Sequence, residues 1–188
     1  MELNYKEFGQ GDPIIILHGL FGTLDNWQTI ARQLANNYMV YIVDQRNHGR
    51  SPHSQEFNYQ VMADDLASFM ESRWIYKAHL IGHSMGGKTA MQFALNHSDL
   101  VDRLIIVDIG PQQYEGRHQT IFEALISIDI KKVESRQQAE AMLATRIEDV
   151  GVRQFLLKNL SRQKEGGYQW KMNLPVLYKE YDRVFEAV

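Results

Sequence analysis

Short aliphatic runs recur along the first part of this chain. Residues 14–17, 39–43 and 104–107 are three of them, and each is bounded by turn-forming or polar residues. A run without polar alternation is typical of a strand that is buried on both faces, as in a parallel sheet covered by helices. Segments with helical spacing separate the runs. We therefore predict an α/β fold with a doubly wound, mostly parallel sheet.

The pattern changes after Pro111. Apolar residues at helical spacing replace the strand runs, and Ser135 with Gln138 forms a capping box at the start of one expected helix. A helical block placed after the fourth aliphatic strand is typical of a cap rather than of further sheet. We therefore predict a core over residues 1–111 and a helical cap or lid over residues 112–188.

Composition narrows the classes of function. With Lys+Arg 20 against Asp+Glu 23, the formal net charge of −3 gives no basic footprint for nucleic acid. The chain has no cysteine, which excludes cysteine nucleophiles and thiolate metal sites, and no metal-binding or cofactor-binding pattern is visible. Residues 1–7 are polar, and the aliphatic runs are too short to span a bilayer. We expect a cytoplasmic protein with no membrane partner, no metal and no organic cofactor.

One short motif indicates a type of catalytic chemistry. Gly82-His83-Ser84-Met85-Gly86 matches the pattern G-x-S-x-G and stands between an apolar strand and a helix. A nucleophile elbow needs this setting, because its tight turn lifts the serine hydroxyl above the sheet. The pattern therefore predicts Ser84 as a nucleophile. The alternative is a glycine-rich turn in which the serine only caps the helix.

The loop that follows the first aliphatic run supports the same chemistry. An acyl-transfer site needs two N–H donors for the developing oxyanion. We predict that Met85, the residue after the serine, supplies one donor and that Leu20 supplies the other, with its neighbour Phe21 as the alternative. Taken alone, the sequence His18-Gly19-Leu20 also fits an ordinary glycine turn.

Four motifs occur in a fixed order within the first 111 residues. They read HGLFG at 18–22, DQRNHGRS at 44–51, GHSMGGK at 82–88 and VDIGP at 107–111. With these motifs the chain resembles the α/β-hydrolase superfamily, in the branch of small bacterial esterases with haloperoxidase-like folds. The resemblance implies a serine esterase with Ser84 as nucleophile, Leu20 and Met85 as oxyanion donors, and a largely structural segment 44–51. Beyond Pro111 the similarity is limited to the pattern of helices.

Asp108 is the predicted acid of a catalytic triad. It follows the aliphatic run 104–107, at the strand end where open α/β sheets place functional groups. Some esterases of the branch that this chain resembles take their acid from this strand. The alternative is a structural aspartate that caps the turn at Gly110.

The catalytic histidine has no clear candidate. Only His97 and His118 follow Ser84, whereas the family order is serine, acid, histidine. His97 stands about 20 Å along the helix from Ser84, at 1.5 Å per residue, and we expect His118 on the surface. We therefore expect a chain that lacks the family's C-terminal strands and histidine, as the N-terminal portion of a longer esterase. A partner chain that completes the sheet and a divergent non-catalytic form are the alternatives.

The function predicted from these features is hydrolysis of carboxylic esters of small acyl groups through an acyl-enzyme on Ser84. Thioesters are a variant substrate, and the rival interpretations are a non-catalytic module that binds a small ligand and an inactive fragment. The strand at 104–107 would leave an aliphatic sheet edge through which the chain could self-associate. The predicted pocket residues, of which those in the cap also fit ordinary packing, are Phe21, His83, Phe122, Leu125 and Phe155.

Overall fold

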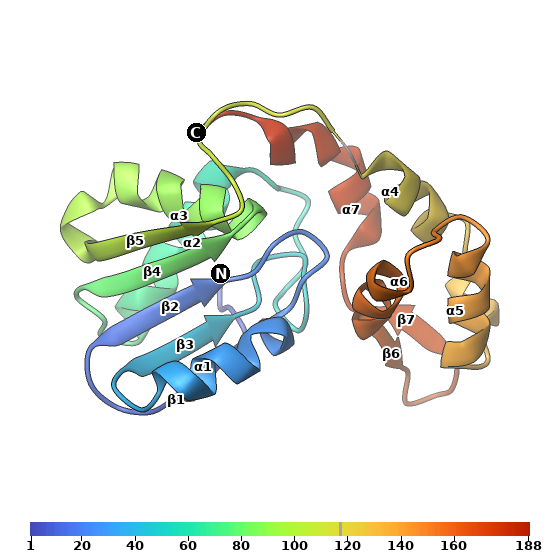
Figure 1. Cartoon of the computed structure of the whole chain (residues 1–188), viewed down its shortest axis with the longest axis horizontal. Coiled ribbons are helices and arrows are strands. Elements are labelled where there is room, and N and C mark those ends of the chain that lie inside the picture. The colour runs from blue at the N-terminus through green and yellow to red at the C-terminus, as the bar shows by residue number, and fades with distance from the viewer. Residues whose placement is uncertain (117) are drawn as a thin grey trace.

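The computed structural model describes residues 1–116 and 118–188, and its core is a five-stranded sheet (Figure 1). The strands are β1 (Tyr5–Phe8), β2 (Pro13–Leu17), β3 (Met39–Val43), β4 (Ala78–His83) and β5 (Val101–Val107). Their order is β1-β3-β2-β4-β5. β1 is antiparallel to β3, and the other pairings are parallel. The predicted α/β class with a mostly parallel sheet is therefore confirmed.

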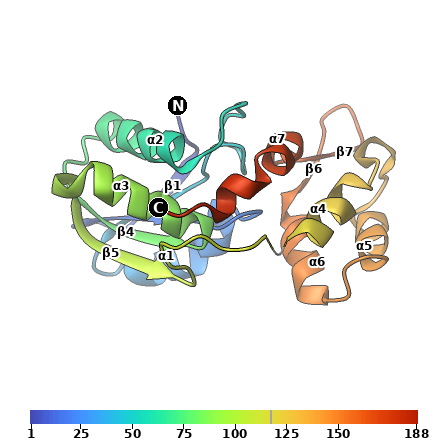
Figure 2. The same cartoon turned by 90° about the horizontal axis from the view of Figure 1, so that it is seen from above.

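Helices cover both faces of this sheet (Figure 2). Along β2, Ile14 and Ile16 pack in one apolar cluster with Ala31 of α1 (Gln28–Leu34). Ile15 and Leu17 point to the other face and pack in a cluster with residues of α2 (Tyr59–Ser72) and α3 (Met85–Asn96). The helix residues in this cluster include Leu66, Phe69, Ala90 and Phe93. Burial on both faces explains why this strand has no polar alternation.

A side-chain hydrogen bond caps the start of α2, whereas a 3₁₀ turn precedes α1. Asn58 caps α2, since its side-chain oxygen accepts from the N–H of Val61 at 2.9 Å. Before α1, the chain instead makes a 3₁₀ turn at Leu24–Trp27, where Asn26 Oδ1 accepts from the N–H of Thr23 at 2.8 Å. Asp25 lies inside this turn and pairs with Lys6 at 2.7 Å.

The remaining helices form a cap beside the carboxyl ends of the parallel strands (Figure 1). The cap elements are α4 (Gln119–Ile126), α5 (Arg136–Ala144), α6 (Val150–Leu156), the hairpin of β6 (Leu160–Arg162) and β7 (Tyr168–Trp170), and α7 (Leu174–Lys179). Ser135 caps α5 as predicted, because its hydroxyl accepts from the N–H of Gln138 at 3.1 Å. None of the described helices is long and apolar enough to cross a membrane.

The chain enters and leaves the cap at the same place. The N–H of Tyr114 donates to the carbonyl of Phe185 at 2.9 Å, and the N–H of Val188 donates to the carbonyl of Pro111 at 2.9 Å. The buried ammonium group of Lys88, on α3, donates to the carbonyl of Gln112 at 2.9 Å and also to that of Glu186. Burial lowers the pKa of Lys88. The final residues therefore return from the cap to the core.

β5 is one edge of the sheet within the described part of the chain. Two of its aliphatic side chains, Leu104 and Ile105, are 38% and 49% exposed. Large exposed aliphatic side chains on an edge strand are the arrangement that sequence analysis predicted for this strand.

Candidate active site

Ser84 lies in a tight turn between β4 and α3. Its φ of +50° and ψ of −119° form a backbone conformation that non-glycine residues rarely adopt. Two backbone hydrogen bonds hold it there, from Ser84 N to the carbonyl of Val107 at 3.0 Å and from Gly87 N to the carbonyl of Ser84 at 2.8 Å. A Cβ atom on Gly82 would lie 2.3 Å from the carbonyl oxygen of Gly86, so the turn requires glycine. This is the geometry of a nucleophile elbow.

The loop after β2 runs directly across this turn. A Cβ atom on Gly19 would lie 3.3 Å from Ser84 Cβ and 2.9 Å from His83 Nδ1. The loop is itself a turn, closed by a hydrogen bond from Gly22 N to the Gly19 carbonyl at 2.9 Å, and Phe21 inside it has a φ of +60°. Leu20, the remaining residue of this turn, is thereby held beside Ser84.

Met85 brings a second backbone N–H to the same place. It is the first residue of α3, so its N–H has no acceptor within the helix and the positive end of the helix dipole lies there. Leu20, Phe21, Ser84 and Met85 all line one cavity. The residues predicted as oxyanion donors are thus brought together around the serine.

That cavity has a volume of about 710 Å³ and lies between the core and the cap. Most of its lining is apolar, and six apolar side chains come from residues 112–188. These are Ile121, Val152, Phe155, Leu156, Val184 and Phe185. Of the five predicted pocket residues, Phe21, His83 and Phe155 line the cavity. Phe122 and Leu125 do not, because they lie on the inner face of α4 and are fully buried in the core of the cap.

Asp108 follows β5 and lines the cavity together with Ser84. Its φ is +57°, a second unusual backbone conformation at this edge of the sheet. The preceding residue, Val107, accepts the hydrogen bond from Ser84 N, so Asp108 comes one residue after the point where the two strand ends are joined. The predicted acid and the predicted nucleophile therefore lie at adjacent strand ends.

Two buried histidines hold the surrounding loops. His18 donates from Nδ1 to the Gly19 carbonyl at 2.9 Å and accepts at Nε2 from Gln45 N at 3.0 Å, which assigns it as a neutral ring. Burial lowers the pKa of His18 to about 4. Burial, followed by the proximity of His18, lowers the pKa of His48 to about 3. Both rings are neutral and structural at pH 7.

His118 lies in the cavity and not on the surface as expected. It is half-buried, and its ring lies between those of Phe21 and Phe185, with centroids 6.3 Å and 6.0 Å away. Burial lowers its pKa. Its Nδ1 is buried and has no hydrogen-bond partner among the described residues. By contrast, His97 ends α3, at the opposite end of that helix from Met85.

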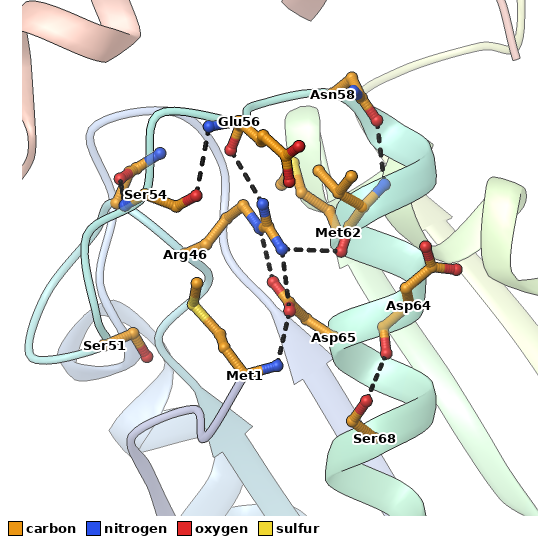
Figure 3. Close-up of polar contacts among 12 residues, drawn as sticks. Met1, Arg46, Ser51, Ser54, Glu56, Asn58, Met62, Asp64, Asp65 and Ser68 are labelled. Atoms are coloured by element: carbon orange, nitrogen blue, oxygen red, sulfur yellow. Dashed lines mark hydrogen bonds and ion pairs between the residues drawn. The ribbon is translucent and has the colours of Figure 1, made fainter.

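The segment 44–51 is held in place by hydrogen bonds and an ion pair of its charged side chains. The carboxylate of Asp44 accepts from Leu24 N at 2.8 Å and from Arg50 N at 2.9 Å. Arg46 forms a buried ion pair with Asp65 of α2, with Nε 2.6 Å and Nη2 3.0 Å from the two carboxylate oxygens (Figure 3). Arg46 also donates to the carbonyl of Glu56 at 2.9 Å. The loop is thus fixed by buried charged groups, in agreement with the structural role that the resemblance implied.

Comparisons with known proteins decide the family. A family model described as the alpha/beta hydrolase fold matches residues 12–137. The chain belongs to the alpha/beta hydrolase fold family. Within this family it is 42% identical to Esterase YbfF of Escherichia coli (strain K12), over 92% of this chain and 66% of that protein.

Two further members of the alpha/beta hydrolase fold family are also similar. The chain is 39% identical to sn-1-specific diacylglycerol lipase ABHD11 of Danio rerio, over 100% of this chain and 65% of that protein. A solved structure described as a marine microorganism esterase is 43% identical with a TM-score of 0.98, covering 100% of this chain and 74% of that one. The chain thus spans about two thirds of the length of the curated hydrolase-fold relatives.

Sequence reasoning missed one residue of this hydrolase-fold site. Asn159, in the cap, is fully buried and donates from Nδ2 to the carbonyl of Phe21 at 2.7 Å. Its partner lies 138 positions away in the chain, so no local pattern marked it. Among the described residues, no group of three or more His, Asp or Glu side chains could hold a metal ion.

Proposed function

We propose that this protein hydrolyses carboxylic esters of small acyl groups through an acyl-enzyme on Ser84. The observation that carries the proposal is the placement of Ser84. It stands in a strained turn at the start of a helix, in contact with the Gly19–Gly22 loop, and faces a cavity lined mainly by apolar side chains. Such an arrangement offers a nucleophile, two backbone donors and an apolar acyl site in one place.

In the proposed reaction the Ser84 hydroxyl oxygen attacks the acyl carbon and passes its proton to a histidine base. The N–H groups of Met85 and Leu20, with Phe21 as the alternative to Leu20, stabilise the negative charge on the acyl oxygen. The histidine then protonates the departing alcohol, and a water molecule releases the acid from Ser84 by the reverse sequence. Thioesters could react by the same steps, with a thiol leaving.

The remaining triad members are part of the proposal. Asp108 lies at the strand end next to Ser84 and serves to orient the histidine. The family order places the histidine after the acid, so we assign it to the part of the relatives' length that these 188 residues do not span. His118 is the alternative, since it lines the cavity and its Nδ1 has no partner among the described residues.

A fluorophosphonate probe tests the proposal through the intact mass of the protein. We expect one adduct on the full-length protein, none on Ser84→Ala, and an unchanged adduct on Ser68→Ala, whose hydroxyl binds the Asp64 carbonyl on the exposed face of α2. Repeating the reaction on His118→Ala and on the 188-residue chain identifies the base. An adduct that persists in Ser84→Ala, or no adduct on any form, would refute the proposal.

The second candidate is a non-catalytic module that binds a small ligand in the same cavity. It is favoured because the rings of His18 and His48 are engaged in structural hydrogen bonds and so do not serve as a base. Of the histidines that line the cavity, only His118 follows Ser84 in the described part of the chain. Titration with an ester analogue separates the two functions. A binder keeps its affinity in Ser84→Ala and forms no adduct with the probe.

A further inference from the structure

One fully buried cap residue reaches the loop that faces Ser84. Asn159 ends the 3₁₀ turn Leu157–Asn159, between α6 and β6, and its side-chain amide donates to the backbone carbonyl of Phe21 at 2.7 Å. The two residues are 138 positions apart in the chain. The hydrogen bond therefore joins the cap to the core directly beside the candidate nucleophile.

Phe21 has an unfavourable backbone conformation that contacts from the cap help to hold. Its φ of +60° lies in the left-handed region, where a non-glycine residue is strained. The cap holds this conformation at two points. Asn159 binds the carbonyl, and the ring of Phe122 packs edge-on against the Phe21 ring with centroids 4.8 Å apart.

Asn159 is itself held in place, so its amide is a fixed donor. Its backbone carbonyl accepts from the N–H of Lys171 at 2.8 Å, immediately after β7. Its side-chain oxygen is buried with no hydrogen-bond partner among the described residues. A buried polar group that is only half satisfied destabilises a core relative to an apolar side chain of the same size. Packing alone therefore does not account for an asparagine at this position, whereas its bond to Phe21 does.

We propose that Asn159 is a positioning residue for the oxyanion-stabilising loop. By holding the Phe21 carbonyl, it fixes the peptide groups of Leu20 and Phe21 in the orientation that receives the developing negative charge. The ability of the Ser84 site to stabilise the oxyanion thereby depends on the cap being packed against the core. The inference rests on the proposed function, but its structural half, the restraint of the loop, can be measured without any reaction.

The test compares two substitutions of Asn159 with a matched control in the full-length protein. Asn159→Leu keeps the branched shape and the number of non-hydrogen atoms and removes the donor, and Asn159→Asp keeps the shape and places a carboxylate against the Phe21 carbonyl. The control is Asn173→Leu, which removes another asparagine bond between cap and core, from Asn173 Nδ2 to Asn47 Oδ1 at 3.0 Å. Asn173 does not line the cavity.

The first readout is steady-state hydrolysis of 4-nitrophenyl butyrate. Since an oxyanion interaction is made in the transition state, both Asn159 variants should lose about 10- to 100-fold in kcat with KM changed less than about twofold. Asn173→Leu should keep kcat within about twofold. Equal losses in Asn159→Leu and Asn173→Leu, or a loss confined to KM, would show that Asn159 only stabilises the cap.

The second readout is amide hydrogen exchange across residues 19–22. The Gly22 amide, bonded to the Gly19 carbonyl, should exchange about tenfold faster in both Asn159 variants and unchanged in Asn173→Leu. This measurement needs no substrate, so it still decides the restraint if the wild-type protein proves inactive and the proposed function fails. Unaltered exchange in a folded Asn159 variant overturns the inference. If Asn159→Leu does not fold, Asn159→Asp provides the same comparison.

Discussion

Gly86 packs so closely on β2 that a Cβ atom added to it would lie 2.4 Å from the carbonyl oxygen of Leu17. β2 is a central strand paired on both sides, so its backbone cannot move away. We expect Gly86→Ala to lower the free energy of unfolding by about 2–3 kcal/mol, measured by urea denaturation. Gly151→Ala, on α6, would bring its Cβ atom near one side-chain oxygen, that of Asp149 at 3.0 Å, and should stay within about 1 kcal/mol of wild type. An unchanged urea midpoint in Gly86→Ala would contradict the contact.

The ion pair between Arg46 and Asp65 gives a second prediction. Both side chains are buried, and removing one charge leaves the other uncompensated (Figure 3). Asp65→Asn should therefore lower the free energy of unfolding by about 3–5 kcal/mol. The matched control is Asp64→Asn on the exposed side of the same helix, where a change within about 0.5 kcal/mol is expected. Equal effects of the two substitutions would argue against a buried pair.

The buried histidines predict how stability depends on pH. The pKa values of His18 and His48 are lowered to about 4 and about 3, whereas an unfolded histidine titrates near about 6.5. Between these values the unfolded chain binds protons that the folded chain does not. Stability is thus complete above about pH 6.5 and falls as the pH drops, by about 1.4 kcal/mol per pH unit for each histidine.

Urea denaturation at several values between pH 7 and pH 5 measures this slope. His48→Gln removes one of the two titrating rings and should reduce the slope by about half. A free energy of unfolding that stays level over this range would show that the two rings are protonated in the folded protein.

The exposed edge of β5 gives a prediction about association. With Ile105 49% exposed on an edge strand, the 188-residue chain made on its own should self-associate through this edge. Ile105→Lys should shift the chain towards monomer in sedimentation velocity. Leu95→Lys, at a residue of α3 that is 70% exposed, should leave the distribution unchanged. Monomeric wild-type chain at the highest attainable concentration would disprove association through β5.

The parts of the fold that sequence could predict are those fixed by local pattern. The aliphatic run at β2 and the capping box before α5 each carry their own signal, and both elements are where they were expected. The antiparallel pairing of β1 with β3 was not predicted, because strand direction depends on contacts distant in sequence. For the same reason the sequence did not reveal the ion pair of Asp25 with Lys6.

The candidate site divides in the same way. The turn at Ser84 could be predicted because glycine spacing reflects a local steric need. The cap residues that line the cavity could not be predicted in this way. Phe122 and Phe155 look equivalent as apolar residues in helices, yet only Phe155 lines the cavity, since helix orientation decides which face is turned inwards. Asn159 had no signal at all, because its partner is a backbone carbonyl in another part of the chain.

Two backbone hydrogen bonds, from Tyr114 to Phe185 and from Val188 to Pro111, hold the two ends of the cap segment next to each other. A segment attached in this way can be replaced during evolution, or by loop grafting, without altering the strand order beneath it. The cap side of the cavity and the turn at Ser84 can then diversify separately, with one restriction. If the amide of Asn159 does hold the Phe21 carbonyl for catalysis, every successful replacement must carry its own donor to that point.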